Sequence, residues 1–180
     1  MPRLFIAIDL PERIKDDITE TYAAIPGARW VDEAQLHLTL RFIGEVPGDV
    51  ADRIVNALRP VGGPAFSLAM KTVGFFPPRK DPRLLWGGIT ESDELMRLQA
   101  RVERALTATG IEADARKFHP HVTVARLNGP PSHKIADYIT HNSLFYTEQF
   151  AVDAFHLYES FLKQEGAHHE KIASYALQSP

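Results

Sequence analysis

One short pattern of residues occurs twice in the sequence. The order His, apolar, Thr, apolar fills residues 37–40 and again residues 121–124, 84 positions later. Each copy lies in an apolar segment typical of a β-strand, where residues i and i+2 point to the same face. The histidine and threonine of each copy are therefore expected to point together, with the apolar residues facing the core.

Two imidazoles and two hydroxyls facing one groove could perform acid–base chemistry on a phosphate. An unperturbed imidazole has a pKa of about 6.5, so one of His37 and His121 can deprotonate water while the other protonates a leaving oxygen. The hydroxyls of Thr39 and Thr123 can donate to non-bridging phosphate oxygens. This scheme requires no cofactor and no metal. The alternative, two ordinary strands with solvated His and Thr, is disfavoured by the matching placement in both halves.

Composition limits the classes of protein to consider. The 180 residues include no cysteine and carry a formal net charge of −3. Disulfides, thiol nucleophiles and thiolate metal sites are thereby excluded. A protein that coats long nucleic acid would be basic, whereas a local pocket for one phosphate remains compatible with this charge. No segment approaches the roughly 18 apolar residues of a membrane span, and no secretory signal is evident, so we expect a cytoplasmic protein.

Hydrophobic periodicity predicts interleaved strands and helices. Helices are expected after Pro11 up to Ile25, over 50–61, from Ser92 to near Gly110 and over 132–141. Strands are expected at 4–10, 29–31, 35–46, 65–76, 84–89, 118–127, 150–162 and 172–177. Hairpin-like strand pairs break strict alternation and indicate an α+β fold with largely antiparallel sheets. Two similar lobes, one for each motif, would place the motifs face to face across a central groove.

These motifs and their flanks resemble the two-histidine phosphoesterase superfamily. Within it, the sequence is most similar to RNA 2′,3′-cyclic phosphodiesterases of bacteria and archaea, historically called 2′-5′ RNA ligases. The similar segments are residues 3–11, Trp30 with 37–46, 118–126 and the strand around 157–160. The stretch 166–170 departs from the family, which often has a Gly-rich segment and a Tyr there.

The resemblance implies one bilobal domain over 1–180, with two α/β lobes about a pseudo-twofold axis. It implies hydrolysis of a terminal RNA 2′,3′-cyclic phosphate to a 2′-phosphomonoester, with reverse 2′-5′ ligation as a second direction. His121 would act as base and His37 as acid. Arg126 would contact the phosphate, and Phe42 would stack on the terminal base. The partner would be an RNA end, and the protein a monomer.

Strand parity conflicts with the roles of Arg126 and Phe42. Each lies five residues after a motif histidine, so a regular strand would point it to the opposite face. A bulge or strand end after Ala125 would bring Arg126 to the groove. Without such an irregularity, Arg126 would be a surface residue and Phe42 a core aromatic.

Several other residues could serve the function or only the structure. The basic stretches 77–83 and 115–126 could guide an RNA backbone or be solvated loops. His119 could tune His121 or merely pack. His168 and His169 are expected to be exposed, and Trp30 and Trp86 to lie in the core. Two further functions stay open: a phosphodiesterase acting on another cyclic or nucleotide-derived phosphate, and a non-catalytic module that binds RNA ends.

Overall fold

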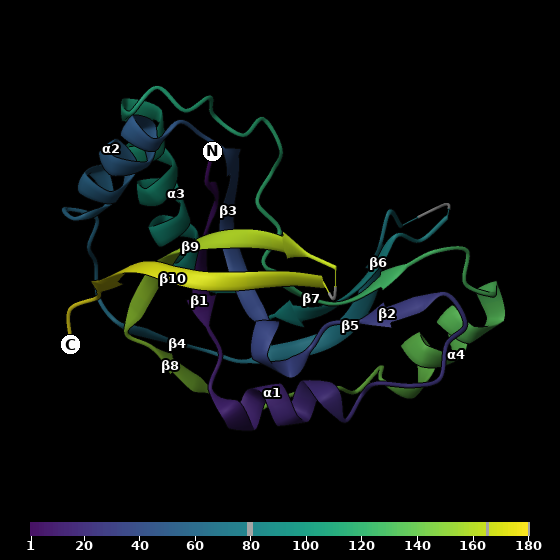
Figure 1. The fold of residues 1–180 in the computed structure, drawn as a ribbon. Helices are drawn as coiled ribbons and strands as arrows, with labels where there is room; N and C mark the ends of the chain where they lie inside the picture. The colour runs from purple at the N-terminus through teal and green to yellow at the C-terminus, as the bar shows by residue number, and fades with distance from the viewer. Residues whose placement is uncertain (79–80, 165, 180) are drawn as a thin grey trace.

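The computed structural model describes residues 1–78, 81–164 and 166–179. Strands and helices are interleaved along the chain, with runs of consecutive strands among them (Figure 1). In order they are β1 (Arg3–Asp9), α1 (Glu12–Thr19), β2 (Ala28–Trp30), the 3₁₀ turn η1 (Glu33–Gln35), β3 (His37–Glu45), α2 (Gly48–Leu58), β4 (Phe66–Leu68), β5 (Met70–Phe76), β6 (Leu84–Ile89), α3 (Asp93–Ala108), β7 (His121–Leu127), α4 (Ser132–His141), β8 (Phe150–Val152), β9 (Ala154–Lys163) and β10 (Gly166–Ala176).

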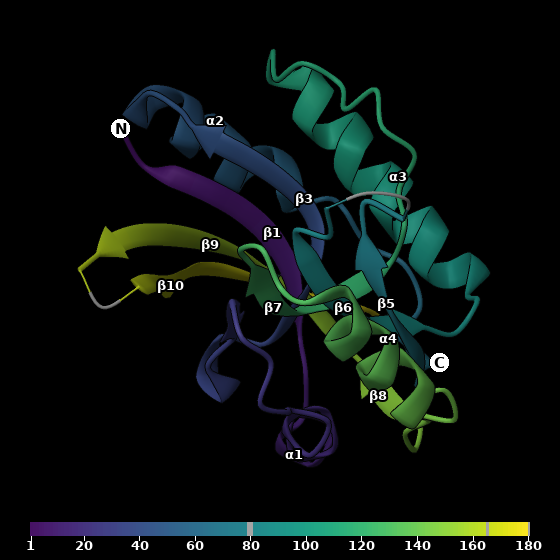
Figure 2. The same cartoon turned by 90° about the vertical axis from the view of Figure 1, so that its right-hand side faces the viewer.

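Two antiparallel sheets form the two lobes. Within the described residues, one four-stranded sheet has the order β10-β9-β1-β3 and the other β2-β7-β6-β5, with a small sheet of β4 and β8 beside them. Helices α2 and α3 lie beside the first sheet, and α1 and α4 lie beside the second (Figures 1 and 2). The first motif begins β3, the second begins β7, and these two strands contact each other. The expected α+β, two-lobed architecture is confirmed.

Apolar side chains from both sheets form one hydrophobic core cluster. Strand β1 is central to its sheet and is buried without interruption from Leu4 to Ile8. Helix α3 begins as the sequence predicts, because the Ser92 hydroxyl accepts a hydrogen bond from the Leu95 N–H at 3.2 Å. None of the helices in the part of the chain that the structure describes is long and apolar enough to cross a membrane.

Two predicted strands are each divided in the structure. The predicted strand 65–76 divides into β4 and β5, and 150–162 divides into β8 and β9. The division has a topological reason: β4 and β8 pair with each other, whereas β5 and β9 each continue into a different four-stranded sheet. The last strand begins at Gly166 instead of residue 172, because it pairs with β9 along nearly its whole length.

Candidate active site

The two motif histidines are held by the same kind of hydrogen bond. Nδ1 of His37 lies 2.6 Å from the carbonyl oxygen of Gln35, and Nδ1 of His121 lies 2.7 Å from the carbonyl oxygen of His119. A carbonyl only accepts hydrogen bonds, so each Nδ1 carries the proton. In the neutral ring, Nε2 is then the nitrogen that can take up a proton.

Two cavities border the strands that carry the motifs. The larger, here the His37 cavity, has a volume of about 810 Å³, and its lining includes His37, Thr39, Phe42, Thr123 and Arg126. The smaller, here the His121 cavity, has a volume of about 570 Å³, and its lining includes Phe76, Trp86, His119 and His121. Both cavities border β7, with His121 in the lining of one and Thr123 in the lining of the other. Five of the six predicted site residues thus line the His37 cavity, and the sixth, His121, lines the other cavity.

A bulge in β3 turns Phe42 to the groove side. Thr39 pairs with Ala7 and Phe42 pairs with Phe5 on the neighbouring strand. Ala7 and Phe5 are two residues apart in β1 and so share a face, although their partners are three residues apart in β3. The extra residue is Leu40, directly after the motif threonine. Phe42 is 43% exposed, which rules out the reading of it as a core aromatic.

The same irregularity in β7 turns Arg126 to the groove side. Thr123 pairs with Trp86 and Arg126 with Leu84, which are two residues apart in β6. The extra residue is Val124, again directly after the motif threonine. The bulge therefore lies slightly earlier than the irregularity expected after Ala125. Its effect is the expected one, because Arg126 and Thr123 line the same cavity.

Positive charge gathers around the His37 cavity. Its lining includes Arg3, Arg29 and Lys163 in addition to Arg126, whereas Asp32 is the carboxylate among the described lining residues. The guanidinium carbon of Arg3 lies 5.1 Å from the centroid of the Phe42 ring. An excess of cations at a cavity favours an anionic ligand such as a phosphate.

Burial shifts the protonation of both motif histidines. Burial lowers the pKa of His37 to about 4, the charges of His169 and Arg126 act in the same direction, and the bond to the Gln35 carbonyl opposes them. Burial also lowers the pKa of His121, against the bond to the His119 carbonyl. Among the described residues, no three His, Asp or Glu side chains are grouped to hold a metal ion.

Comparison with known proteins identifies the family. Residues 10–161 match the 2′-5′ RNA ligase superfamily. The chain belongs to this superfamily.

Two relatives match about nine tenths of the chain. An RNA 2′,3′-cyclic phosphodiesterase of Thermotoga maritima is 34% identical, and the match covers 91% of this chain and 89% of the relative. One from Archaeoglobus fulgidus is 32% identical, over 91% of this chain and 94% of the relative. The crystal structure of E. coli LigT complexed with 3′-AMP superposes with a TM-score of 0.78 and 26% identity, covering 99% of both chains.

His169 lies in the candidate site, contrary to expectation. It was expected to be exposed with His168, yet it lines the His37 cavity. Its ring meets the His37 ring edge-on, with centroids 5.5 Å apart, and meets Phe5 edge-on at 4.8 Å. The cause is strand β10, which runs further than predicted and turns His169 inward while His168 faces solvent. Adjacent side chains of a strand point to opposite faces, so a strand predicted through residue 169 would have turned one of His168 and His169 inward.

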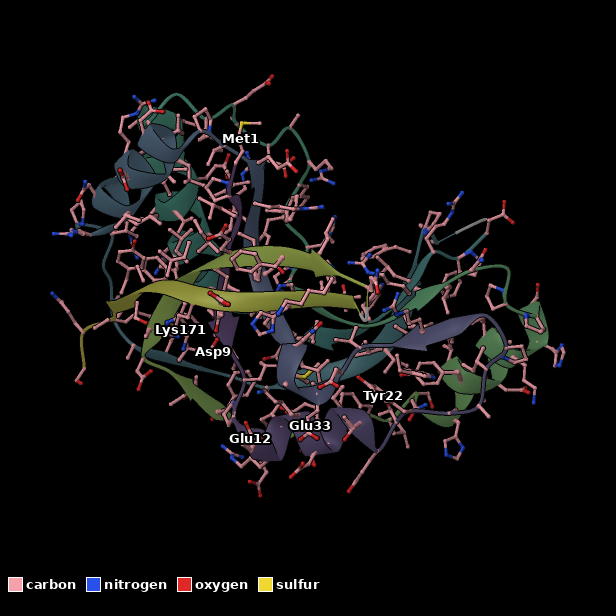
Figure 3. All side chains as sticks on the ribbon, in the orientation of Figure 1. Met1, Asp9, Glu12, Tyr22, Glu33 and Lys171 are labelled. Carbon is pink, nitrogen blue, oxygen red and sulfur yellow. The ribbon has the colours of Figure 1, made fainter. Side chains whose placement is uncertain are left out.

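An ion-paired cluster supports His37 from the neighbouring strands. Asp9 pairs with His37 in the β1–β3 register. Its carboxylate accepts hydrogen bonds from the Tyr158 hydroxyl and, at 2.7 Å, from the Lys171 ammonium. Asp9 and Lys171 are labelled in Figure 3. These bonds lower the pKa of Asp9 although burial alone would raise it. The Tyr158 ring stacks on Phe5, which in turn contacts His37 with ring centroids 4.9 Å apart.

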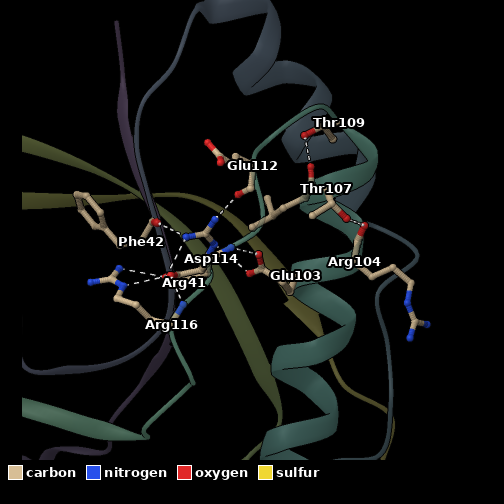
Figure 4. Close-up of polar contacts among 10 residues, drawn as sticks. Arg41, Phe42, Glu103, Arg104, Thr107, Thr109, Glu112, Asp114 and Arg116 are labelled. Atoms are coloured by element: carbon tan, nitrogen blue, oxygen red, sulfur yellow. Dashed lines mark hydrogen bonds and ion pairs between the residues drawn. The ribbon is translucent and has the colours of Figure 1, made fainter.

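Arg41 connects the first motif strand to helix α3 and to the segment before the second motif (Figure 4). It follows the Leu40 bulge in β3, and its Nε lies 2.9 Å from Glu103 of α3. The same guanidinium reaches Asp114, at 3.2 Å, and the carbonyl oxygen of Glu112, at 2.6 Å, in the segment that leads to the second motif. Its side chain is only 10% exposed, so these ion pairs are largely shielded from water.

The predicted basic stretches are only partly near the cavities. Arg116 donates to Asp114, and these bonds lower the pKa of that carboxyl to about 2. Lys117 and Arg83 are absent from the described linings of both cavities. Arg79 and Lys80 lie outside the described residues. Trp30 and Trp86, expected in the core, are half-buried, and each lines one of the cavities.

Proposed function

We propose that this protein hydrolyses the terminal 2′,3′-cyclic phosphate of RNA to a 2′-phosphomonoester, with His37 and His121 as its acid–base pair. The observation that carries the proposal is the matched pair of histidines on the contacting strands β3 and β7, each held by a Nδ1–carbonyl bond. The names of the relatives from Thermotoga maritima and Archaeoglobus fulgidus support the same substrate class.

The His37 cavity suits the cyclic phosphate and its nucleoside. Thr39 and Thr123 would donate to the non-bridging oxygens, and Arg126 would balance their charge. The exposed ring of Phe42 would stack on the terminal base. The further cations of this cavity would attract the RNA backbone, which accounts for RNA as substrate despite the net charge of −3.

Protons would move in opposite directions at the two imidazoles. His121 takes a proton from water through Nε2, and the water oxygen attacks phosphorus. The bond from phosphorus to the 3′ oxygen breaks, and His37 donates its Nε2 proton to that oxygen. Burial keeps His37 neutral in the unliganded protein, and the negative charge of the bound phosphate raises its pKa toward the value an acid needs.

Two other functions are weaker explanations of this site. Another cyclic or nucleotide-derived phosphate would use the same four motif residues, and comparison of substrates would identify it. A non-catalytic RNA-end binder would need the cations and aromatic rings but has no use for two Nε2 atoms prepared for proton transfer. Ligation with a 2′-5′ linkage would use the same acid–base pair, with an RNA 5′-hydroxyl in place of the attacking water.

The test is turnover of a dinucleotide that ends in a 2′,3′-cyclic phosphate. His37→Ala and His121→Ala should each lower kcat by about 10²- to 10⁴-fold, since each removes one partner of the proton transfer. His133→Ala, an exposed histidine of α4, serves as the control and should keep the wild-type rate. Near wild-type kcat in either motif variant would refute the acid–base pair.

A second substrate separates the acid from the base. When sulfur replaces the bridging 3′ oxygen, the leaving thiolate needs no proton. His37→Ala should then recover most of its lost activity, whereas His121→Ala should not. Recovery by His121→Ala alone would reverse the two assignments.

A further inference from the structure

The proposed hydrolysis uses only part of the His37 cavity. The cyclic phosphate would lie between the motif threonines, and the terminal base would lie on Phe42. Three polar residues of the same lining, Arg3, Ser160 and His169, have no part in that reaction. They come from three neighbouring strands of the first sheet, β1, β9 and β10. The cavity therefore offers polar groups to a further part of the substrate.

Strand register places these three side chains in one row across the sheet. His169 pairs with Ser160 between β10 and β9. Leu4 pairs with Glu159 in the antiparallel register of β1 and β9, so Arg3 comes opposite Ser160 one step further along. Residues directly opposite each other have Cβ atoms about 4.5–5.5 Å apart, close enough for their side chains to bind one ligand. The row presents a guanidinium, a hydroxyl and an imidazole to the same cavity.

Arg3 lies beside the ring that would receive the terminal base. Its guanidinium carbon is 5.1 Å from the centroid of Phe42, over one face of the ring, which leaves the other face to the base. In a nucleotide, the base and the 5′ carbon project from one face of the ribose, and the 2′ and 3′ oxygens project from the other. A phosphate on the 5′ oxygen therefore lies on the side of the base, next to Arg3.

Ring packing fixes the imidazole of His169 at this end of the cavity. The ring meets Phe5 edge-on with centroids 4.8 Å apart and meets His37 edge-on at 5.5 Å. Nδ1 of His169 is buried, so Nε2 is the nitrogen that a ligand in the cavity can reach. With a proton on Nε2, the imidazole donates a hydrogen bond to a phosphate oxygen in either charge state.

The charge around the row favours an anion. Lys163, exposed at the end of β9, lies in the same lining three residues beyond Ser160. Asp32 is the carboxylate among the described lining residues, so cations are in excess. Hydrogen bonds to a charged phosphate are stronger than those between neutral groups, and a guanidinium suits phosphate geometry well. A phosphate is therefore the chemical group that best fits these three side chains.

We propose that Arg3, Ser160 and His169 bind the phosphate on the 5′ side of the terminal nucleotide. The proposal rests on the proposed function, which places the cyclic phosphate and the base in the same cavity. It makes the protein selective for nucleotides that carry a 5′-phosphate group, as every RNA end longer than one nucleotide does, over nucleosides with a free 5′-hydroxyl. The RNA chain then continues toward Lys163 and the hairpin of β9 and β10. No bond forms or breaks at this subsite.

Two compounds that differ by one phosphate test the subsite in the wild-type protein. The first is adenosine 2′,3′-cyclic phosphate, and the second carries in addition a 5′-methylphosphate, whose single charge matches that of an RNA diester. The second should be hydrolysed with a kcat/KM at least about tenfold higher, because the hydrogen bonds to its 5′-phosphate form only there. Equal kcat/KM values for the two compounds overturn the proposal. If neither compound is hydrolysed, the proposed function fails instead.

Substitutions in the row identify the groups that recognise the 5′-phosphate. Arg3→Met removes the guanidinium, and His169→Phe removes the nitrogens but keeps an aromatic ring in place. Each should lower the ratio of the two kcat/KM values about tenfold, chiefly through the 5′-phosphorylated compound. His168→Phe, on the exposed side of β10, and Arg97→Met, on the exposed surface of α3, are the matched controls and should keep the wild-type ratio. A wild-type ratio in either row variant, including one produced by equal losses on both compounds, overturns the proposal.

Discussion

Phe42 and Arg126 occupy equivalent positions in the two lobes, each five residues after its motif histidine and each turned to the groove by one extra strand residue. The extra residues, Leu40 and Val124, directly follow Thr39 and Thr123. The two lobes therefore repeat the position of the bulge as well as the sequence motif. It gives one lobe an aromatic ring and the other a guanidinium at the same distance along the strand.

These two side chains should differ in what they contribute. Arg126→Met removes a charged partner of the phosphate and should lower kcat/KM by about 10- to 100-fold. Phe42→Ala removes a stacking surface and should chiefly raise KM. Arg97→Met, on the exposed surface of α3, is the control for loss of positive charge. Steady-state kinetics on the cyclic-phosphate dinucleotide give kcat and KM for the three variants. A wild-type kcat/KM in Arg126→Met would show that Arg126 does not contact the phosphate.

The motif threonines should matter less than the histidines. Thr39→Val and Thr123→Val each remove one hydrogen bond to a charged phosphate, about 1.5–3 kcal/mol, and keep the side-chain shape. We expect kcat/KM to fall by about 10- to 100-fold in each variant. If either loss equals that of the histidine variants, the hydroxyl has a more direct part in the reaction.

The pH dependence should have its maximum on the acid side of neutrality. A working pair needs one proton, and burial lowers the pKa of both histidines, that of His37 to about 4. The singly protonated pair therefore predominates below pH of about 6.5 in the unliganded protein and is lost as pH rises. A plot of kcat/KM against pH should be a bell centred below that value, whereas kcat should be centred higher because bound phosphate stabilises the proton. A kcat/KM constant up to pH 9 would contradict this account.

The ion pairs of Arg41 should be a major contribution to stability. Arg41→Met leaves Glu103 without its ion-pair partner and Asp114 with Arg116 alone, at a site largely shielded from water, which should lower the free energy of unfolding by about 3 kcal/mol. Arg53→Met removes an exposed pair with Asp49 and should change it by at most about 0.5 kcal/mol. Urea denaturation gives the free energy of unfolding of both variants. Equal losses in the two variants would show that the shielded ion pairs of Arg41 stabilise the protein no more than an exposed pair does.

Local patterns in the sequence predicted much of this structure. The paired motifs, the Ser92 helix start and the α+β class follow from periodicity and capping. The bulges that orient Phe42 and Arg126 depend on cross-strand register, which no single strand sequence specifies. His169 was missed for a related reason: β10 is a polar strand stabilised by pairing with β9, so its own hydrophobic pattern is weak.

Phosphorus NMR of the reaction in excess chelator tests the central claim most directly. A dinucleotide 2′,3′-cyclic phosphate, incubated with the wild-type protein and EDTA, should convert completely to one product, the 2′-phosphomonoester, identified against authentic 2′- and 3′-phosphates. One regioisomer is expected because acid and base lie on different lobes and can reach only one ribose oxygen in line. An unchanged cyclic phosphate, conversion that begins only after zinc or manganese is added, or a product that is mainly the 3′-phosphate would contradict the account.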